Sequence, residues 1–317
     1  MTVTTGRAGG VGPQVAAAGH HRPGRPRPAW HALTGWGFAL PFVALFVVFM
    51  AGPVLASLAM SFTDIRSADL RDPLGVEIVG IDNYRRLFTD DLFLRAAGNT
   101  AIFVVLGVPL TMAAALVVAL GVNSGVTRFR TVFRVGYYLP VVTSIVAISV
   151  VWRFLLQPQT GLVNSLLGLV GLGGPNWLND THLALPTLIV MAAWRNLGFS
   201  MVIFLAGLQA IPRDLYEAAT IDGAGRWAQF RYITLPVLRP TVLFVAVVTT
   251  IGYVQFFEEP FVMTQGGPLD STLSLAYHTY NQFGFGNYGY ASAMSYVLFL
   301  VVVALSIAWF RLLRSNT

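Results

Sequence analysis

Residues 211–240 have the sequence IPRDLYEAATIDGAGRWAQFRYITLPVLRP, and they form the one long polar interval of the chain that carries an organised helix signal. Pro212 suits an early helical position, and Asp214 and Glu217 are favoured near the positive N-terminal end of a helix dipole. Gly223 then supplies a helix stop. The predicted helix is only about three turns long, which makes it marginal in isolation. We therefore expect another surface to dock on it.

Apolar runs flank this interval on both sides. Hydrophobic residues make up 55% of the 317-residue chain and charged residues only 11%, against roughly 25% charged residues in soluble domains. Most runs reach or exceed the ~20 residues that a helix needs to cross a bilayer, and they are too uniformly apolar for the strands of a membrane barrel. Backbone groups in lipid must be satisfied within each segment, so these runs are predicted to be helices.

The predicted fold class is an all-α polytopic membrane protein with six transmembrane helices and a short polar helix between the fourth and the fifth. The transmembrane domain should cover residues 36–317. Its spans are expected at residues 36–63, 98–122, 135–155, 183–208, 240–262 and 290–312, with the polar interval at 211–239. Residues 1–35 are rich in Gly, Pro, Ala and Arg and show no apolar period, so we expect a disordered tail that is not a cleaved secretory signal.

Arginine distribution sets the expected orientation, because basic residues favour the cytoplasmic side of a membrane. Arginines gather in the tail, in the connection after the second span, in the polar interval and at the C-terminus, whereas the connections at 157–182 and 258–289 contain none. Both termini and the polar interval are therefore predicted to be cytoplasmic.

Residue types that are missing exclude several functions. The chain contains no cysteine, and all 20 of its Lys or Arg positions are Arg. Disulfide and thiolate chemistry are excluded, and so are a P-loop and a Schiff base, which need lysine. The arginines are spread along the chain, which speaks against nucleic acid binding. We expect no metal site and no catalytic residue.

A spaced motif lies inside the polar interval. Glu217-Ala218-Ala219 is followed after three residues by Gly223 and after nine more by Ile233-x-Leu235-Pro236. This spacing resembles the EAA loop of permease subunits of binding-protein-dependent ABC importers. In that family the loop is a cytoplasmic coupling helix that sits in a cleft of the ATP-hydrolysing subunit; the alternative is an ordinary surface helix. The resemblance implies that ATP and Mg²⁺ belong to the partner ATPase and that this chain binds no cofactor. The implied coupling residues are Asp214, Glu217, Ala218, Ala219, Asp222, Gly223, Gly225, Leu235 and Pro236.

Three further motifs resemble the MalF-like half of carbohydrate importers. They are Gly80-Ile81-Asp82-Asn83-Tyr84, Asn99-Thr100 and Thr264-Gln265-Gly266-Gly267-Pro268. The resemblance implies a multi-pass protein of the bacterial plasma (inner) membrane. The implied partners are a second, MalG-like permease, a dimer of ATP-binding subunits, an extracellular solute-binding protein or lipoprotein, and the lipid bilayer.

Polar side chains inside the spans indicate either a substrate pathway or an interhelical contact. Arg195, next to Asn196, should lie roughly 18 Å below the start of the fourth span at 1.5 Å per residue. It either lines the route or bonds to helix-end carbonyls or to an acid such as Glu258. The end of the fifth span combines aromatic rings, which can cover the apolar faces of a sugar, with amide and carboxylate groups, which can bind its hydroxyls. The alternative is that these residues form an aromatic belt at the membrane surface. The candidate pathway residues are Arg195, Asn196, Tyr253, Gln255, Phe256, Glu258 and Glu259.

These features predict a permease subunit of an ATP-driven, binding-protein-dependent importer of sugars, forming half of the translocation pathway. The substrate could instead be a glycerol phosphate, which Arg195 would favour. An ion-coupled secondary transporter is a further alternative. An intramembrane protease is a rival from another class, with Ser200 as nucleophile and His182 or His278 as base.

Overall fold

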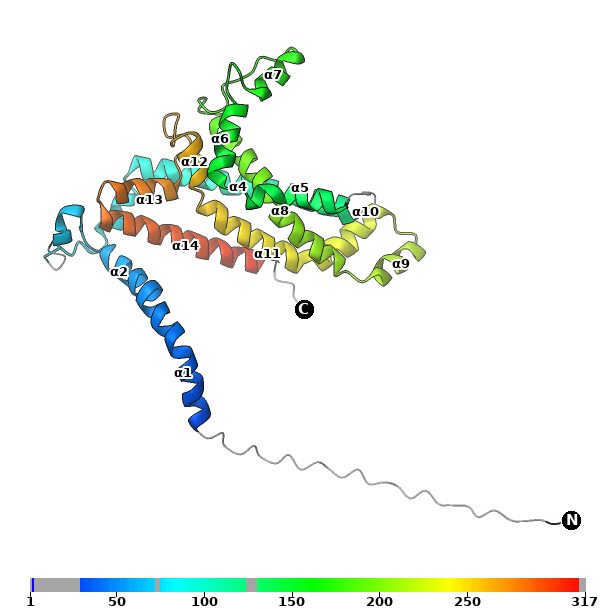
Figure 1. Cartoon of the computed structure of the whole chain (residues 1–317), viewed down its shortest axis with the longest axis horizontal. Helices are drawn as coiled ribbons and strands as arrows, with labels where there is room; N and C mark the ends of the chain where they lie inside the picture. Colours follow the sequence, from blue (N-terminus) through cyan, green and yellow to red (C-terminus); the bar gives the residue numbers. More distant parts are fainter. Residues whose placement is uncertain (1, 3–28, 72–74, 124–129, 314–317) are drawn as a thin grey trace. The chain divides into compact units, whose positions relative to one another are not determined.

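A computed structural model of the chain describes residue 2 and residues 29–71, 75–123 and 130–313 (Figure 1). The described residues are largely helical, and their β pairing is limited to an isolated antiparallel bridge between Thr63 and Ile78. In chain order the helices are α1 (Ala29–Phe46), the π-helix η1 (Val47–Ala51), α2 (Gly52–Met60), the 3-10 helix η2 (Ser67–Arg71), α3 (Asp82–Leu87), α4 (Asp91–Asn123), α5 (Arg130–Val142), α6 (Ile145–Leu155), α7 (Leu162–Leu169), α8 (Ala184–Gln209), α9 (Arg213–Ile221), α10 (Arg226–Gln229), the π-helix η3 (Phe230–Thr234), α11 (Leu235–Val254), α12 (Glu258–Met263), α13 (Leu275–Gly284) and α14 (Tyr288–Leu313).

Five helical segments among the described residues are long and apolar enough to cross a bilayer. They are Trp36–Met60, Asp91–Asn123, Ala184–Gln209, Arg226–Val254 and Tyr288–Leu312. A sixth is reached when the bent pair Val132–Val142 and Ile145–Leu155 counts as one span. The all-α polytopic fold is confirmed.

The chain divides into two compact units, Met1–Val54 and Leu55–Thr317. The first unit holds α1, η1 and the start of α2. Its predicted disordered tail at residues 1–35 lies mostly outside the described residues. The prediction is wrong for residues 29–35, because α1 already begins at Ala29. The second unit contains the rest of α2 and all later helices.

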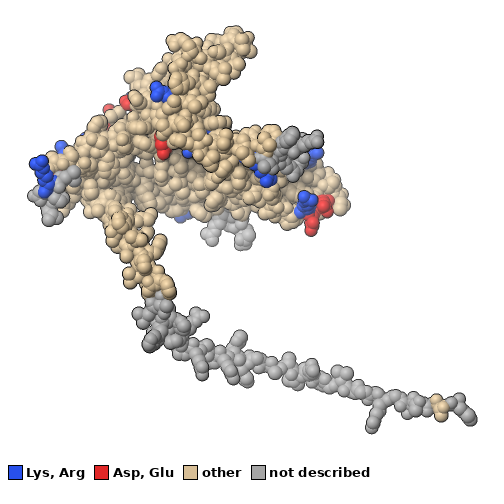
Figure 2. All heavy atoms as spheres, viewed as in Figure 1, with Lys and Arg blue, Asp and Glu red and all other residues tan. Residues whose placement is uncertain are grey.

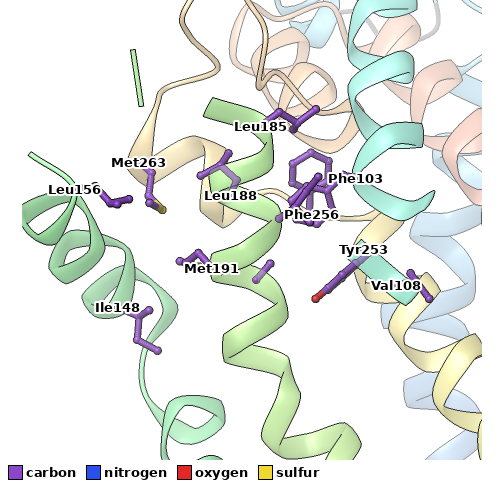
Figure 3. Close-up of a cluster of buried hydrophobic side chains, with 12 residues drawn as sticks. Phe103, Val108, Ile148, Leu156, Leu185, Leu188, Met191, Tyr253, Phe256 and Met263 are labelled. Atoms are coloured by element: carbon purple, nitrogen blue, oxygen red, sulfur yellow. The ribbon is translucent and has the colours of Figure 1, made fainter. Parts of the chain in front are cut away.

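Helix α8 packs against α4, α5 and α11 in the second unit, and α14 packs on α11 and α13. Two apolar clusters hold the two ends of α8 in place. One surrounds Leu185 and Leu188 (Figure 3), and the other surrounds Phe204 and Leu208. On the face drawn in Figure 2 the side of the bundle is mostly uncharged, as lipid contact requires.

The predicted third span, residues 135–155, is not a straight helix. It is broken between α5 and α6, whose axes differ by 100°. Ser144 at the break has φ −54° and ψ 126°, outside the helical region. Pro140 lies one turn earlier and cannot donate the backbone hydrogen bond expected of a helical residue, which weakens the helix here.

The ends of two other spans also differ from the prediction. Helix α4 starts at Asp91 rather than near residue 98, because Asp90 caps it: one carboxylate oxygen accepts from the amides of Leu92 and Phe93 at 2.9 and 3.2 Å. Burial alone would raise the pKa of Asp90. Hydrogen bonds from the Tyr290 hydroxyl and from these two amides lower the pKa by more than burial raises it, so the pKa lies below its ordinary value. The fifth span was expected at 240–262, yet the helix covers 226–254 and a separate short helix, α12, follows.

Motifs that are far apart in the sequence meet in the second unit. The Asn99 side chain donates to the carbonyls of Asp270 and Leu273 at 2.8 and 3.0 Å, and the Thr100 hydroxyl accepts from the Leu275 amide at 3.0 Å. The Asn99-Thr100 pair thus holds the segment that follows Pro268. These contacts fix the segment between α12 and α13 against α4.

Candidate functional site

A cavity of about 240 Å³ lies beside the middle of α8, between that helix and the C-terminal end of α11. We call it the mid-span cavity. Its lining residues are Arg195, Asn196, Phe199, Ser200, Val248, Thr249, Gly252, Tyr253, Phe256, Glu258 and Glu259. Six of the seven predicted pathway residues are therefore brought together. Gln255 is not among the lining residues, because it lies in the turn where α11 ends and its side chain is exposed.

Sequence reasoning missed several lining residues, notably Ser200, Thr249 and Gly252. Ser200 follows Asn196 by four positions, so the two lie on one face of α8. That spacing was a usable signal. Thr249 and Gly252 stand four and one positions before Tyr253 on α11, but nothing in the sequence shows that this face of α11 meets α8.

Arg195 has no ionic partner in the described part of the chain. The described salt bridges do not include it, so no carboxylate oxygen lies within 4.0 Å of its guanidinium. Its Nε is buried and makes no hydrogen bond. The structural alternative, in which Arg195 bonds to a carbonyl or to Glu258, is thus not seen. Arg195 as a whole is only half-buried. A buried donor such as this Nε is nevertheless costly to leave without a partner, and a ligand in the cavity would satisfy it.

Glu259 is a buried acidic residue of the cavity. It is 5% exposed, and its Oε2 makes no hydrogen bond within the described residues. Glu258 beside it is exposed. With one arginine and two glutamates, the cavity offers both hydrogen-bond donors and acceptors that the protein itself leaves unused.

The aromatic wall of the cavity is held rigidly. The ring of Phe256 stacks on Phe103 with centroids 3.8 Å apart and planes 7° apart (Figure 3). The Tyr253 hydroxyl forms a 2.6 Å hydrogen bond with the Thr111 hydroxyl. Gly107 makes room for the tyrosine ring, since a Cβ there would lie 2.7 Å from it. Two rings are thus fixed by α4, which pre-organises the apolar surface of the site.

A second candidate site lies beyond the C-terminal end of α8, at helix α9. The helix begins after Pro212, which has φ −58° and ψ 134° and precedes the first helical residue. It ends at Ile221, and Gly223 follows with φ +78°. The Ala224 amide donates to the Ala219 carbonyl at 2.8 Å, which closes the last turn. The predicted helix and its glycine stop are both present.

One face of α9 is anchored to the bundle and the other is uncovered. The Tyr216 hydroxyl bonds to the Thr234 hydroxyl at 2.9 Å, and Tyr216 packs against the apolar cluster that includes Leu208 and Leu238. On the other side Leu215 and Ile221 are 43% and 86% exposed. The predicted coupling residues are exposed, apart from the half-buried Ala219 and Leu235. A short amphipathic helix with free apolar side chains suits docking of another protein.

Comparison with known proteins identifies the family. Residues 107–315 match the family described as "Binding-protein-dependent transport system inner membrane component". The chain belongs to this family. This permease is 37% identical over 292 residues to the "Lactose transport system permease protein LacF" of Rhizobium radiobacter, a match that covers 90% of this chain and 96% of the relative. It is 33% identical over 278 residues to the "Arabinooligosaccharides transport system permease protein AraP" of Bacillus subtilis (strain 168), covering 87% of each.

A solved structure shares the fold of the permease. It is a chain of a bacterial ABC transporter involved in the import of the acidic polysaccharide alginate, with a TM-score of 0.78 and 25% identity, covering 91% of this chain and 98% of that one. The resemblance to ABC importer permeases is confirmed. The permease is a transport subunit and a multi-pass inner membrane protein.

The protease alternative finds no support in the site. Ser200 is 1% exposed, and no described hydrogen bond joins it to a histidine. His278 lies instead beside Asp90, with 4.0 Å between its Nε2 and the carboxylate. The residues proposed for that chemistry do not form a catalytic arrangement.

Proposed function

We propose that this permease forms half of the translocation pathway of an ATP-driven importer of neutral sugars or short oligosaccharides. The observation that carries the proposal is the mid-span cavity, where a fixed aromatic wall faces polar side chains that lack partners in the described chain. Rings that cover the apolar faces of a pyranose and groups that bind its hydroxyls are what a sugar requires. The names of the lactose and arabino-oligosaccharide relatives support the same substrate class.

The charges of the cavity favour a neutral substrate. Arg195 alone would attract an anion, which keeps a glycerol phosphate open as a second candidate. Two carboxylates, Glu258 and Glu259, line the same cavity and oppose an anion. We therefore favour a sugar, whose hydroxyls donate hydrogen bonds to a carboxylate, over a phosphate.

The cavity is smaller than the roughly 300 Å³ at the lower end of most small-molecule sites, which fits a pathway whose other half comes from a second, MalG-like permease. In the proposed assembly both termini and α9 face the cytoplasm, and α9 docks on one subunit of an ATPase dimer. An extracellular solute-binding protein delivers the sugar. Asp214, Glu217, Ala218, Ala219, Asp222, Gly223, Gly225, Leu235 and Pro236 form or shape the docking surface.

Transport by the reconstituted complex tests the proposal. The permease, co-purified with its partner chains and binding protein, is placed in liposomes and supplied with lactose, arabinotriose, maltotriose or glycerol 3-phosphate. We expect ATP-dependent uptake of at least one of the three sugars and none of glycerol 3-phosphate. Uptake of the phosphate alone, or uptake driven by an ion gradient without ATP, would overturn the proposal.

A further inference from the structure

A second pocket, of about 310 Å³, lies outside the mid-span cavity and shares no residue with it. We call it the loop pocket. It is bordered by the end of α6, by the loop before α8 and by the last residue of α12, and its polar or aromatic lining includes Arg153, Phe154, Gln157, Asn176 and Asn179. Leu156, which also lines it, packs in the same cluster as Leu185 at the start of α8. The loop pocket is therefore at the end of α8 opposite to α9.

The walls of the loop pocket are tied together by one buried side chain. Asn164 donates to the carbonyls of Pro158 and Pro175, both at 3.1 Å. Its own side-chain oxygen accepts from the Trp177 indole at 2.7 Å. Pro158 lies on one wall, and Pro175 and Trp177 belong to the loop that carries Asn176 and Asn179. The two walls are thus held at a fixed separation, so the pocket is formed before anything binds.

The chemistry of the lining matches that of a carbohydrate subsite. Phe154 is 63% exposed and offers a ring face. No hydrogen bond in the described chain uses the side-chain amides of Asn176 or Asn179, which leaves donors and acceptors free for hydroxyl groups. Arg153 gives one bond to the Val262 carbonyl at 3.3 Å and keeps its other donors. Among the residues that the structure describes, no acidic one lines the pocket.

Helix α12 connects the loop pocket to the mid-span cavity. Its first residues, Glu258 and Glu259, line the cavity, and its last residue, Met263, lines the loop pocket. Six helical residues span about 9 Å at 1.5 Å per residue. A chain of a few linked sugar rings is long enough to bridge such a gap, whereas a single ring is not.

We propose that the loop pocket is a second saccharide subsite, which holds one ring of an incoming oligosaccharide while another ring reaches the mid-span cavity. This inference rests on the proposed function. It assigns Phe154 as the stacking surface and Asn176 and Asn179 as the hydroxyl-binding groups. A substrate of two or more rings gains contacts here that a monosaccharide lacks.

Cysteine protection in the reconstituted complex tests the subsite, because the permease has no native cysteine. Asn179→Cys places a thiol in the loop pocket. Leu169→Cys, at a position 82% exposed on α7 and outside the pocket, is the matched control. Each variant is treated with a thiol reagent, with and without whichever of lactose, arabinotriose or maltotriose the wild-type complex takes up. At about ten times the sugar concentration that half-saturates uptake by the same variant, labelling at residue 179 should slow about tenfold, while labelling at residue 169 should not change.

Three other outcomes are informative. If the transported sugar leaves labelling at residue 179 unchanged, the subsite is refuted and the proposed function stands. If the sugar-free binding protein slows that labelling as much as the sugar does, the pocket is a protein contact and the subsite is again refuted. If the wild type takes up none of the three sugars, the proposed function fails and the subsite fails with it.

Substitution of the stacking ring gives a second test, because its effect on uptake should depend on the length of the sugar. Phe154→Ala removes the stacking ring at a site that is exposed, so the fold should persist. We expect the half-saturating concentration to rise several-fold for a trisaccharide and to stay unchanged for the monosaccharide of the same series. An equal change for both would contradict the proposed subsite.

Discussion

Gly252 is the residue at which the pathway can be closed with the least disturbance. It lies on α11 and lines the mid-span cavity, and a Cβ added there would meet no atom within 4 Å. Gly252→Leu should therefore fill the cavity without strain, and leucine is also the better helix former. We expect sugar uptake by proteoliposomes to fall at least tenfold while the thermal unfolding temperature of the complex is maintained or raised.

Gly98→Leu is the control for this substitution. Gly98 is also helical and exposed, with open space at its Cβ, but it lies on α4 away from the cavity. Uptake should remain near wild type in that variant. If Gly252→Leu transported sugar normally, the mid-span cavity would not be the route.

Most residues of the mid-span cavity could be predicted from residue type alone. A charged or amide side chain in an apolar helix, such as Arg195 or Asn196, stands out against its surroundings because burying it is costly. Gln255 was wrongly grouped with its neighbours because a continuous helix was assumed there. Thr249 could not be found, because a threonine inside a helix commonly bonds to its own backbone, and only the packing of α11 on α8 gives it a place in the cavity.

Helix α9 depends on the conformation of the residue that ends it. Gly223 has φ +78°, where a β-branched residue is strained. Gly223→Val should misplace the end of α9 and its exposed Ile221, at a cost of about 1–2 kcal/mol. We expect sugar-stimulated ATP hydrolysis and uptake to fall together, because a misplaced α9 cannot pass the substrate signal to the ATPase. Gel filtration shows whether the complex still assembles.

Gly223→Asn gives the matched comparison, because asparagine tolerates the left-handed region better than other residues with a Cβ. It should retain more uptake than the valine variant. Equal activity of the valine variant and wild type would show that the geometry of this turn does not matter for coupling.

Sequence patterns predict the presence of the membrane helices well and their breaks and ends poorly. Long apolar runs predict helices reliably, because no other local structure satisfies the backbone in lipid. The 100° break between α5 and α6 was not predicted. Pro140 marks a weak point, but a proline can kink a span without breaking it, and the direction of α6 is set by its packing against α12. The end of α11 was also missed, since Phe256 and Phe257 extend the apolar pattern past Val254.

For the whole molecule, the decisive question is which side of the membrane each end of α8 faces. The loop pocket and α9 lie at opposite ends of this 26-residue helix, which is long enough to cross the ~30 Å hydrocarbon core. If α8 spans the membrane, the two sites must face opposite compartments. The arginine distribution predicts that α9 is inside.

Single cysteines can show this orientation directly. In intact cells, a membrane-impermeant thiol reagent should label Leu169→Cys on α7 and should not label Ile221→Cys on α9. Both positions are more than four-fifths exposed, at 82% and 86%, so accessibility alone does not separate them. In inverted vesicles stripped of the ATPase subunits the pattern should reverse. Adding the ATPase subunits back should protect residue 221, because its apolar side chain is proposed to dock there. Labelling of residue 221 from outside intact cells would refute the coupling role of α9, since ATP is available only in the cytoplasm.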